Sequence, residues 1–402
     1  MVPNGWDLAC FESLKISIID GDRGINYPKK EDYLTDGYAL FLGADNIENG
    51  LLNIEKTIYI SKEKHNSMRK GVVQESDIIL VMRGNGTGRS CIYTNKVESH
   101  AARINSGLII IRVHQDYSNV HFLQQLLLSP VIQKQFESFM FGSAQPQLTV
   151  RLLKSLRFAC PPPLEQKKIS QILTTWDQAI ATTERLLDLA RQQKKALMQQ
   201  LLTGKKRLAD KSGVKFQSEW HRTELGELLD YKQPTPYLVD STEYRDEYKI
   251  PVLTAGKTFI LGYTDETSGI YQEDLPAIIF DDFTTDSKFV DFPFKAKSSA
   301  MKILVAKKGV SIKYVFEAMQ MLNFAVGGHQ RHWISIFSNL VVPIPSKEEQ
   351  EKIATVLSAA DQEIDTLLSQ LNGLKQEKKA LMQTLLTGKR RVSLENTERT
   401  PC

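Results

Sequence analysis

The chain has 402 residues, a formal net charge of +4 at pH 7, and 42% hydrophobic residues. This length accommodates two domains of ordinary size, and the charge is far from the strongly basic balance that by itself indicates a nucleic-acid-binding protein. The four cysteines form no C-x-x-C pair, so the sequence predicts neither a disulfide framework nor a zinc site. No apolar run approaches the roughly 18 residues of a membrane span, and the first residues lack a signal-peptide layout. Together these features predict a cytoplasmic protein in a reducing compartment.

Residues 1–160 alternate between short apolar runs and polar loops, which is typical of a mixed α/β domain. The predicted elements are strands at 51–60, 77–82 and 107–113 and helices at 120–128 and 131–141, with Pro130 separating the two helices. A glycine-rich loop that carries Arg83 and Arg89 follows the second strand, and a polar loop with Gln145 and Gln147 follows the helices. We therefore expect a first domain with two polar surface loops.

A long helix is predicted after this domain, at 161–208, and a second one at 345–391. The segment 194–207 returns almost unchanged at 378–391, a shift of 378 − 194 = 184 positions, which is typical of one domain plus a connector. Both copies carry apolar residues at heptad spacing over about four heptads, and each helix is expected to be about 60 Å long. The seam positions are Leu173, Trp176, Ile180, Leu187 and Leu197 in the first copy, and Leu357, Ile364, Leu371 and Leu381 in the second.

Helices of this length with one apolar stripe need a partner in water. The simplest partner is the other copy, which gives an antiparallel coiled coil that acts as a spacer within one chain; the alternative is that each helix packs on its neighbouring domain. Lys194 and Lys378 lie on the seam near its ends, where they either snorkel to solvent or meet acidic partners. Gly204 and Gly388 stand where a left-handed residue ends a helix, and 392–402 is left as a C-terminal tail.

Residues 209–344 repeat the order of elements of the first domain. The predicted elements are strands at 250–254, 277–280 and 301–306 and a helix at 310–322. Under the same shift, Gln145 and Gln147 fall on His329 and Arg331, whereas the apolar positions that follow them match. Matching scaffolds with different loops are expected of two modules with one fold and two different ligands. The predicted fold is therefore α+β, with two similar mixed α/β domains separated by two long helices in an antiparallel coiled coil with pseudo-two-fold symmetry.

Two segments of the second domain match enzyme motifs only in part. Residues 255–258 look like the end of a phosphate-binding loop, but Pro251 stands where that loop needs a glycine. Asp282, Asp286 and Lys288 suggest a metal-dependent nuclease, although three such residues in one short loop occur often by chance. One alternative function is thus a stand-alone DNA-modifying or DNA-cleaving enzyme with its site around Asp282. No catalytic or metal-ligating set can be assigned from spacing.

The polar loops of both domains carry side chains of the kinds that contact DNA. Arg, Lys, Asn, Gln and His read base edges, while Ser and Thr hydroxyls position phosphates. The candidates are Arg83, Asn85, Thr87, Arg89, Gln145 and Gln147 in the first domain, and Lys257, Thr284, Thr285, Lys288, His329, Gln330, Arg331 and His332 in the second. Each of them is alternatively a solvated or locally hydrogen-bonded loop residue. Trp333 is expected in the core.

Two variable domains joined by two copies of a long helix that ends in Leu-Leu-Thr-Gly-Lys resemble the specificity subunit of Type I restriction–modification enzymes. The segments Pro-Pro-Pro-Leu-Glu-Gln and Pro-Ile-Pro-Ser-Lys-Glu-Glu-Gln that lead into the helices are similar to recurrent segments of that family. Gly-Ser-Ala-Gln-Pro-Gln-Leu, in the polar loop of the first domain, is similar to another. The resemblance covers nearly the whole chain, and the duplicated helix is its most specific part.

The resemblance implies that each domain is a target recognition domain that reads one half of a bipartite, asymmetric double-stranded DNA target. The helix pair would set the gap between the halves and dock two methyltransferase subunits, and restriction subunits would join the full complex. S-adenosylmethionine, ATP and Mg²⁺ are then expected on those partner subunits, while this chain is expected to be non-catalytic, with no cofactor, metal or membrane partner. A third possibility is a protein-only scaffold that assembles through the coiled coil.

Overall fold

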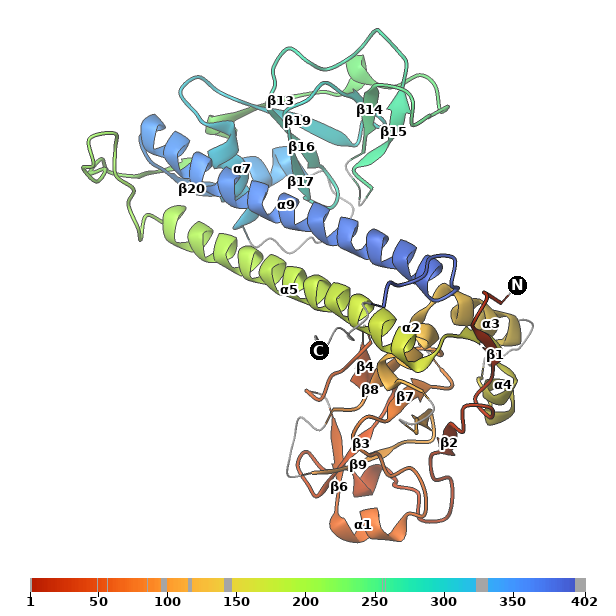
Figure 1. The fold of residues 1–402 in the computed structure, drawn as a ribbon. Helices are drawn as coiled ribbons and strands as arrows, with labels where there is room; N and C mark the ends of the chain where they lie inside the picture. Colours follow the sequence, from red (N-terminus) through yellow and green to blue (C-terminus); the bar gives the residue numbers. More distant parts are fainter. Residues whose placement is uncertain are drawn as a thin grey trace, which may run out of the picture. The chain divides into compact units, whose positions relative to one another are not determined.

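The computed structural model divides into two compact units, one made of Met1–Thr183 with Gln370–Cys402 and the other of Glu184–Ser369. Each unit contains one domain and a part of each long helix (Figure 1). The structure describes residues 2–48, 50–55, 57–84, 86–94, 100–114, 118–140, 147–254, 256, 258–322 and 332–394, with only the backbone of His332.

The first unit is built on two small sheets that share a core. One has the antiparallel order β2-β10-β7-β8, and in the other, β6-β3-β9, strand β3 pairs antiparallel with β6 and parallel with β9. Two further pairs are β1-β11 and β4-β5. Ile79 and Val81 of the first sheet pack in one cluster with Leu40 and Leu42 of the second. The bounds are β1 Asp7–Ala9, β2 Ser17–Asp20, β3 Ala39–Leu42, β4 Ile47–Glu48, β5 Leu51–Leu52, β6 Ile58–Ile60, β7 Ile78–Val81, β8 Ser90–Ile92, β9 Ala101–Ile104, β10 Leu108–Arg112 and β11 Phe158–Cys160.

Helices cover the other face of the β7–β10 sheet. The alternation of the strands places Ile78 and Leu80 on this face, where they share a core cluster with Phe122 and Leu126 of α2. The helix α2 begins after Asn119, whose side chain accepts a hydrogen bond from the N–H of Phe122. The helices of this domain are η1 Lys30–Asp32, η2 Ala44–Asn46, α1 Lys62–Ser67, α2 Val120–Leu128, α3 Pro130–Met140 and α4 Val150–Ser155.

The second unit repeats this topology. Its sheets have the orders β13-β19-β16-β17 and β15-β14-β18, and β12 pairs with β20. As in the first unit, the middle strand of the three-stranded sheet pairs antiparallel on one side and parallel on the other. The bounds are β12 His221–Glu224, α6 Leu225–Leu228, β13 Leu229–Lys232, η3 Thr235–Tyr237, β14 Ile250–Leu253, β15 Ile260–Thr264, β16 Ala277–Asp281, β17 Ser287–Val290, β18 Lys295–Ala296, β19 Met301–Ala306, α7 Ile312–Gln320, α8 His332–Ser335, η4 Phe337–Asn339 and β20 Val341–Ile344.

The strand predicted at 51–60 is wrong, because the chain turns in its middle. Strands β5 and β6 are separated by a turn in which the side chain of Asn53 accepts a hydrogen bond from the N–H of Glu55. The N–H of Thr57 donates to the carbonyl of Ile54 in the same turn. Asparagine competes for backbone hydrogen bonds in this way, which ends a strand that its apolar neighbours would otherwise continue.

The two long helices are α5, Pro163–Leu201, and α9, Lys347–Leu385, of 39 residues each. In the first unit Leu173 of α5 lies in one core cluster with Met382 and Leu385 of α9 and with α2. In the second unit Leu357 of α9 lies in one cluster with Leu201 of α5 and with α7. Within each unit, then, a helix segment packs both on the other long helix and on the domain. The two kinds of packing expected of the apolar stripe therefore occur together.

The predicted seam is buried to different degrees. Leu173, Leu187, Leu357 and Leu371 are buried, whereas Trp176, Ile180, Leu197, Ile364 and Leu381 are partly buried. Gly204 and Gly388 adopt the predicted left-handed conformation, with φ angles of +70° and +67°. The helices end shortly before them, at Leu201 and Leu385 rather than at residues 208 and 391.

The seam lysines meet acidic partners in equivalent places. Lys378 pairs with Asp177 in the first unit, and Lys194 pairs with Asp361 at 2.6 Å in the second. The second unit adds the fully buried Glu317 of α7, which pairs with Lys194 at 3.0 Å. In the first unit Glu165 pairs with Arg391 as well as Asp177 with Lys378, and in the second Arg207 pairs with Glu349 as well as Lys194 with Asp361. Because the numbers rise along one helix and fall along the other, the paired helix segments run antiparallel within each unit.

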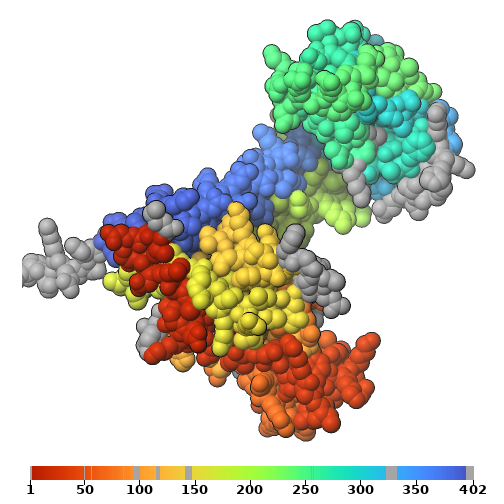
Figure 2. All heavy atoms as spheres, turned by 90° about the vertical axis from the view of Figure 1, so that its right-hand side faces the viewer, coloured from red at the N-terminus to blue at the C-terminus, as the bar shows by residue number. Residues whose placement is uncertain are grey.

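In each unit a buried carboxylate at the start of one long helix contacts side chains from two other segments of the chain. In the first unit Glu165 accepts a hydrogen bond from the indole N–H of Trp6 at 2.9 Å and pairs with Arg391, which follows the end of α9. Figure 2 shows the first residues of the chain, in red, against the last turns of α9, in dark blue.

The same arrangement recurs in the second unit. Glu349 accepts from the guanidinium of Arg207 at 2.7 Å and from the indole of Trp220 at 3.2 Å. Trp6 and Trp220, each near the start of its domain, therefore make equivalent contacts.

Because Leu173 is fully buried between α2 and α9, we expect Leu173→Ala to lower the stability of the first unit by about 2–5 kcal/mol. The matched control is Leu164→Ala on the same helix, where the side chain is 69% exposed and the expected change is within about 0.5 kcal/mol. Hydrogen exchange at the amides of β7 and β10 measures the change in stability of both variants. Equal effects of the two substitutions would contradict the packing described above.

The ion pairs of Asp361 with Lys194 and Lys313 should make the stability of the second unit depend on pH. Burial raises the pKa of the Asp361 carboxyl, but hydrogen bonds from Lys194 and Lys313 outweigh it and hold the pKa below its ordinary value. A depressed folded pKa contributes stability above the unfolded value of about 3.9 and loses it as the pH falls further. Asp361→Asn should therefore destabilise the second unit by about 1 kcal/mol at pH 7, and the difference should shrink below about pH 4.

The measurement is hydrogen exchange in α7 and in the first half of α9 across this pH range. Asp365→Asn, at an exposed position of the same helix, is the control and should show no such pH dependence.

Candidate nucleic-acid interface

Two loops that lie far apart in the sequence meet at the end of β7. Gln147 forms an isolated antiparallel bridge with Arg83, and the N–H of Leu148 donates to the carbonyl of Met82 at 2.7 Å. The glycine-rich loop after β7 and the polar loop before α4 therefore share one site in the first domain. Asn85 and Gln145 lie outside the described residues.

The glycine-rich loop divides its polar side chains between surface and scaffold. Arg83 is exposed and donates to the hydroxyl of Ser106 at 2.6 Å. Thr87 donates to the carbonyl of Gly84 at 2.7 Å, and Arg89 donates weakly to that of Gly86 at 3.4 Å, so both help to shape the loop. Gly86 has a φ of +88°, a backbone conformation that favours glycine, and the guanidinium of Arg89 packs over it.

In the second domain the equivalent loop after β16 is a tight turn organised by Asp281. Its carboxylate accepts hydrogen bonds from the N–H of Phe283 at 2.9 Å and from the hydroxyl of Thr284 at 2.8 Å. Thr285 adopts a positive φ of 62° in this turn. Lys288 follows on the edge strand β17 with an exposed side chain. Thr284 thus has a local hydrogen-bonding role, while Lys288 is available at the surface.

Asp282 connects this turn to the next candidate loop. It is 2% exposed, and its carboxylate accepts a hydrogen bond from the N–H of Trp333 at 2.8 Å. Its other oxygen lies 3.9 Å from the buried ammonium of Lys302. Trp333 is buried against Phe280, as expected of a core residue. Asp282 therefore fixes the start of α8.

The remaining second-domain candidates fall mostly on undescribed positions. Lys257, His329, Gln330 and Arg331 lie outside the described residues, and of His332, which opens α8, the side chain does. Among the described residues, no group of three or more His, Cys, Asp or Glu side chains is placed to hold a metal ion. In the same part of the chain, no helix is long and apolar enough to cross a membrane.

A loop between β2 and η1 lines a further pocket, and none of its residues was among the candidates predicted from the sequence. Residues 20–26, Asp-Gly-Asp-Arg-Gly-Ile-Asn, line a pocket together with Arg69 and Lys70. A signal was present, since two glycines and two aspartates around an arginine indicate a fixed turn directly after an apolar run.

One fold with two different sets of loop side chains, at the same place in each domain, defines a protein with two recognition modules. The family model of the Type I restriction modification DNA specificity domain matches residues 19–191 and 217–376. The chain therefore belongs to the Type I restriction–modification DNA specificity family.

Individual relatives agree with this assignment. Over 158 residues the chain is 51% identical to the Type I restriction enzyme EcoR124I/EcoR124II specificity subunit of Escherichia coli, a match that covers 38% of each protein. It is 24% identical to the putative type I restriction enzyme MjaX specificity subunit of Methanocaldococcus jannaschii, over 97% of this chain and 95% of that one. The S subunit of a Type I system from M. genitalium has the same fold, with a TM-score of 0.64 at 16% identity over 96% of this chain and 98% of that one.

The placement of Asp282 separates a structural role from a catalytic one. Asp282→Ala removes the acceptor of the Trp333 N–H and the carboxylate near Lys302, so we expect a loss of about 2–4 kcal/mol in the second unit. Asp286→Ala, at an exposed carboxylate of the same turn, should be nearly neutral. Thermal unfolding of the two variants tests this. If Asp286→Ala abolished a DNA-cleaving activity of the chain alone without loss of stability, the enzyme interpretation would be favoured instead.

Proposed function

We propose that this chain is a non-catalytic specificity subunit that reads a bipartite, asymmetric double-stranded DNA target, one half with each domain. The observation that carries the proposal is the repeated strand order of the two domains with different side chains in the loops after β7 and β16. Identical folds place the loops equivalently, and different side chains select different bases. Arg83, Gln147 and Lys288 are the described candidates for direct contact, while Thr87, Arg89 and Thr284 support the loops.

The long helices suit the role of a spacer between two readers. At about 1.5 Å per residue, 39 residues span about 60 Å, which exceeds the distance of about 34 Å between successive major-groove sites on one face of DNA. We further propose that α5 and α9 form the coiled coil that sets the gap and dock two methyltransferase subunits. Restriction subunits complete the complex, and S-adenosylmethionine, ATP and Mg²⁺ bind to these partners.

The sharpest test assigns each half-site to a domain. With the methyltransferase subunits added, Arg83→Ala or Gln147→Ala should alter recognition of the first half-site only, and Arg331→Ala that of the second only. Each lost base contact should cost about 1–3 kcal/mol in discrimination. Methylation rates on a set of single-base variants of the target measure this.

Arg83→Lys is the matched control for charge. It keeps a cation for phosphate but loses the two parallel donors that recognise guanine. Compared with Arg83→Ala, it should regain affinity for DNA but not discrimination between bases. Exchange of the second domain that left both half-sites unchanged would refute the proposal. DNA binding that remained undetectable at low salt with all partners present would favour a protein-only scaffold.

A further inference from the structure

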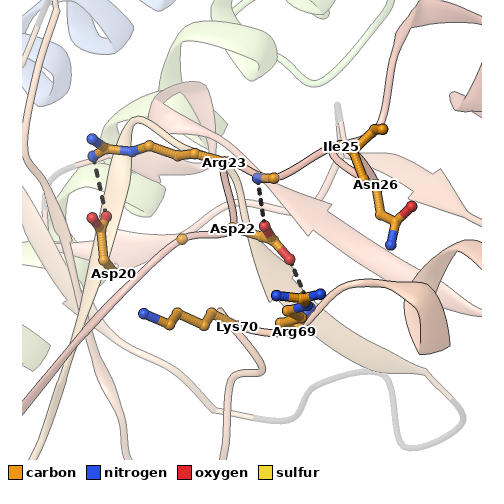
Figure 3. A pocket seen from close by; sticks show the side chains of 9 residues that line it. Asp20, Asp22, Arg23, Ile25, Asn26, Arg69 and Lys70 are labelled. Atoms are coloured by element: carbon orange, nitrogen blue, oxygen red, sulfur yellow. Dashed lines mark hydrogen bonds and ion pairs between the residues drawn. The ribbon is translucent and has the colours of Figure 1, made fainter.

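The pocket between loop 20–26 and Arg69–Lys70, called here the Ile25 pocket, has a volume of about 370 Å³ (Figure 3). Its most prominent side chain is Ile25, which is 98% exposed. A singly exposed apolar residue is common on protein surfaces and needs no explanation by itself. Ile25 differs because the loop that presents it is held in place from several sides.

The loop is fixed by the buried carboxylate of Asp22. One oxygen accepts the N–H of Gly24 at 2.7 Å, and the other accepts the N–H of Arg69 at 2.6 Å (Figure 3). These hydrogen bonds hold the pKa of Asp22 below its usual value, so the carboxylate stays charged at neutral pH. A turn follows in which the N–H of Tyr27 donates to the carbonyl of Gly24 at 3.0 Å, with Ile25 at its tip.

The opposite wall is built around a buried arginine. Arg103 is 4% exposed and donates to the carbonyls of His65, Met68 and Lys70 at 2.6 to 3.0 Å. Because one guanidinium donates to three backbone carbonyls, it fixes the backbone of this segment. The exposed side chains of Arg69 and Lys70 therefore project from a rigid base. Among the described residues, neither side chain has a hydrogen-bond or ion-pair partner.

The Ile25 pocket is continuous with the candidate DNA interface. The hydroxyl of Tyr27, at the end of the loop, accepts the N–H of Ser106 at 3.2 Å, and the hydroxyl of Ser106 accepts from Arg83 at 2.6 Å. Arg23 contacts the sulfur of Met82 at 3.6 Å, directly before Arg83. A duplex that contacts Arg83 therefore lies beside the pocket.

We infer that the Ile25 pocket is part of the DNA-reading surface of the first domain, with Ile25 touching the C5-methyl group of a thymine in the major groove and Arg69 and Lys70 binding flanking phosphates. This inference rests on the proposed function. A thymine methyl is the apolar feature of the major groove, and an exposed aliphatic side chain on a fixed loop, across the pocket from two cations, is suited to it. Ile25 is thus a specificity-determining residue distinct from the polar readers near β7.

Uracil in place of thymine removes only the methyl group and tests the contact directly. After the target has been mapped from methylated adenines, each thymine of the first half-site is replaced singly by uracil, and binding by the complex with methyltransferase subunits is measured. We expect a loss of about 3–10-fold at one position for the unaltered chain. Ile25→Ala should show that loss already on thymine DNA and should no longer distinguish the two bases.

Two further variants serve as controls. Leu8→Ala removes another apolar side chain of the first unit that is 63% exposed and should keep the preference for thymine. Arg69→Ala with Lys70→Ala should weaken all sequences equally and reduce the slope of log affinity against log salt by about 0.9 per lost phosphate contact.

The outcomes separate this inference from the proposed function. If no thymine of the first half-site responds to uracil, or if Ile25→Ala keeps the full preference, the inference is overturned while the Arg83→Ala result still supports two-domain reading. If the complex recognises no bipartite site at all, the proposed function itself is overturned.

Discussion

Each unit depends on a buried carboxylate at the start of a long helix. Glu165 and Glu349 are 6% and 0% exposed, and each accepts hydrogen bonds from a tryptophan at the opening of the domain and from an arginine just past the end of the other helix. A buried carboxylate is costly unless its oxygens are paired, so removal of the arginine would leave an uncompensated buried charge. This requirement ties three distant parts of the sequence together and fixes the framework on which the loops are carried.

The framework leaves the loops free to differ. In the first unit Asp177 accepts a hydrogen bond from the amide of Gln125 on α2, and in the second the position on α7 equivalent to Gln125 is Glu317, which pairs with Lys194 and Lys313. The equivalent positions therefore join the charged cluster on the long helices in different ways, with a neutral amide that contacts the aspartate in the first unit and with a carboxylate that contacts the lysine in the second. The exposed side chains of Arg83 and Lys288, in and after the corresponding loops, make none of these contacts with the long helices, so they can differ between the domains without a change of framework.

Much of the framework was predictable because it repeats. Heptad spacing and the 184-residue shift located both long helices. Side-chain roles in the loops were not predictable, because they depend on partners far away in the sequence. Nothing near Asp282 in the sequence indicates that Trp333 is its partner, and nothing near Arg69 indicates that Arg103 lies beneath it. Glu349 stands three residues after Ser346, which is the spacing of a helix capping box. Its carboxylate instead accepts hydrogen bonds from Arg207 and Trp220.

The division of the chain also affects the order in which it folds during synthesis. Residues 184–369 are contiguous, so the second unit has all its parts once they have emerged from the ribosome. The core of the first unit includes Met382 and Leu385, which are made about 200 residues after its domain. At about 5–20 residues per second, the earlier domain waits for roughly 10–40 s with an apolar surface uncovered. The domain translated first is therefore the last to be completed, and it is the one that most needs protection by chaperones.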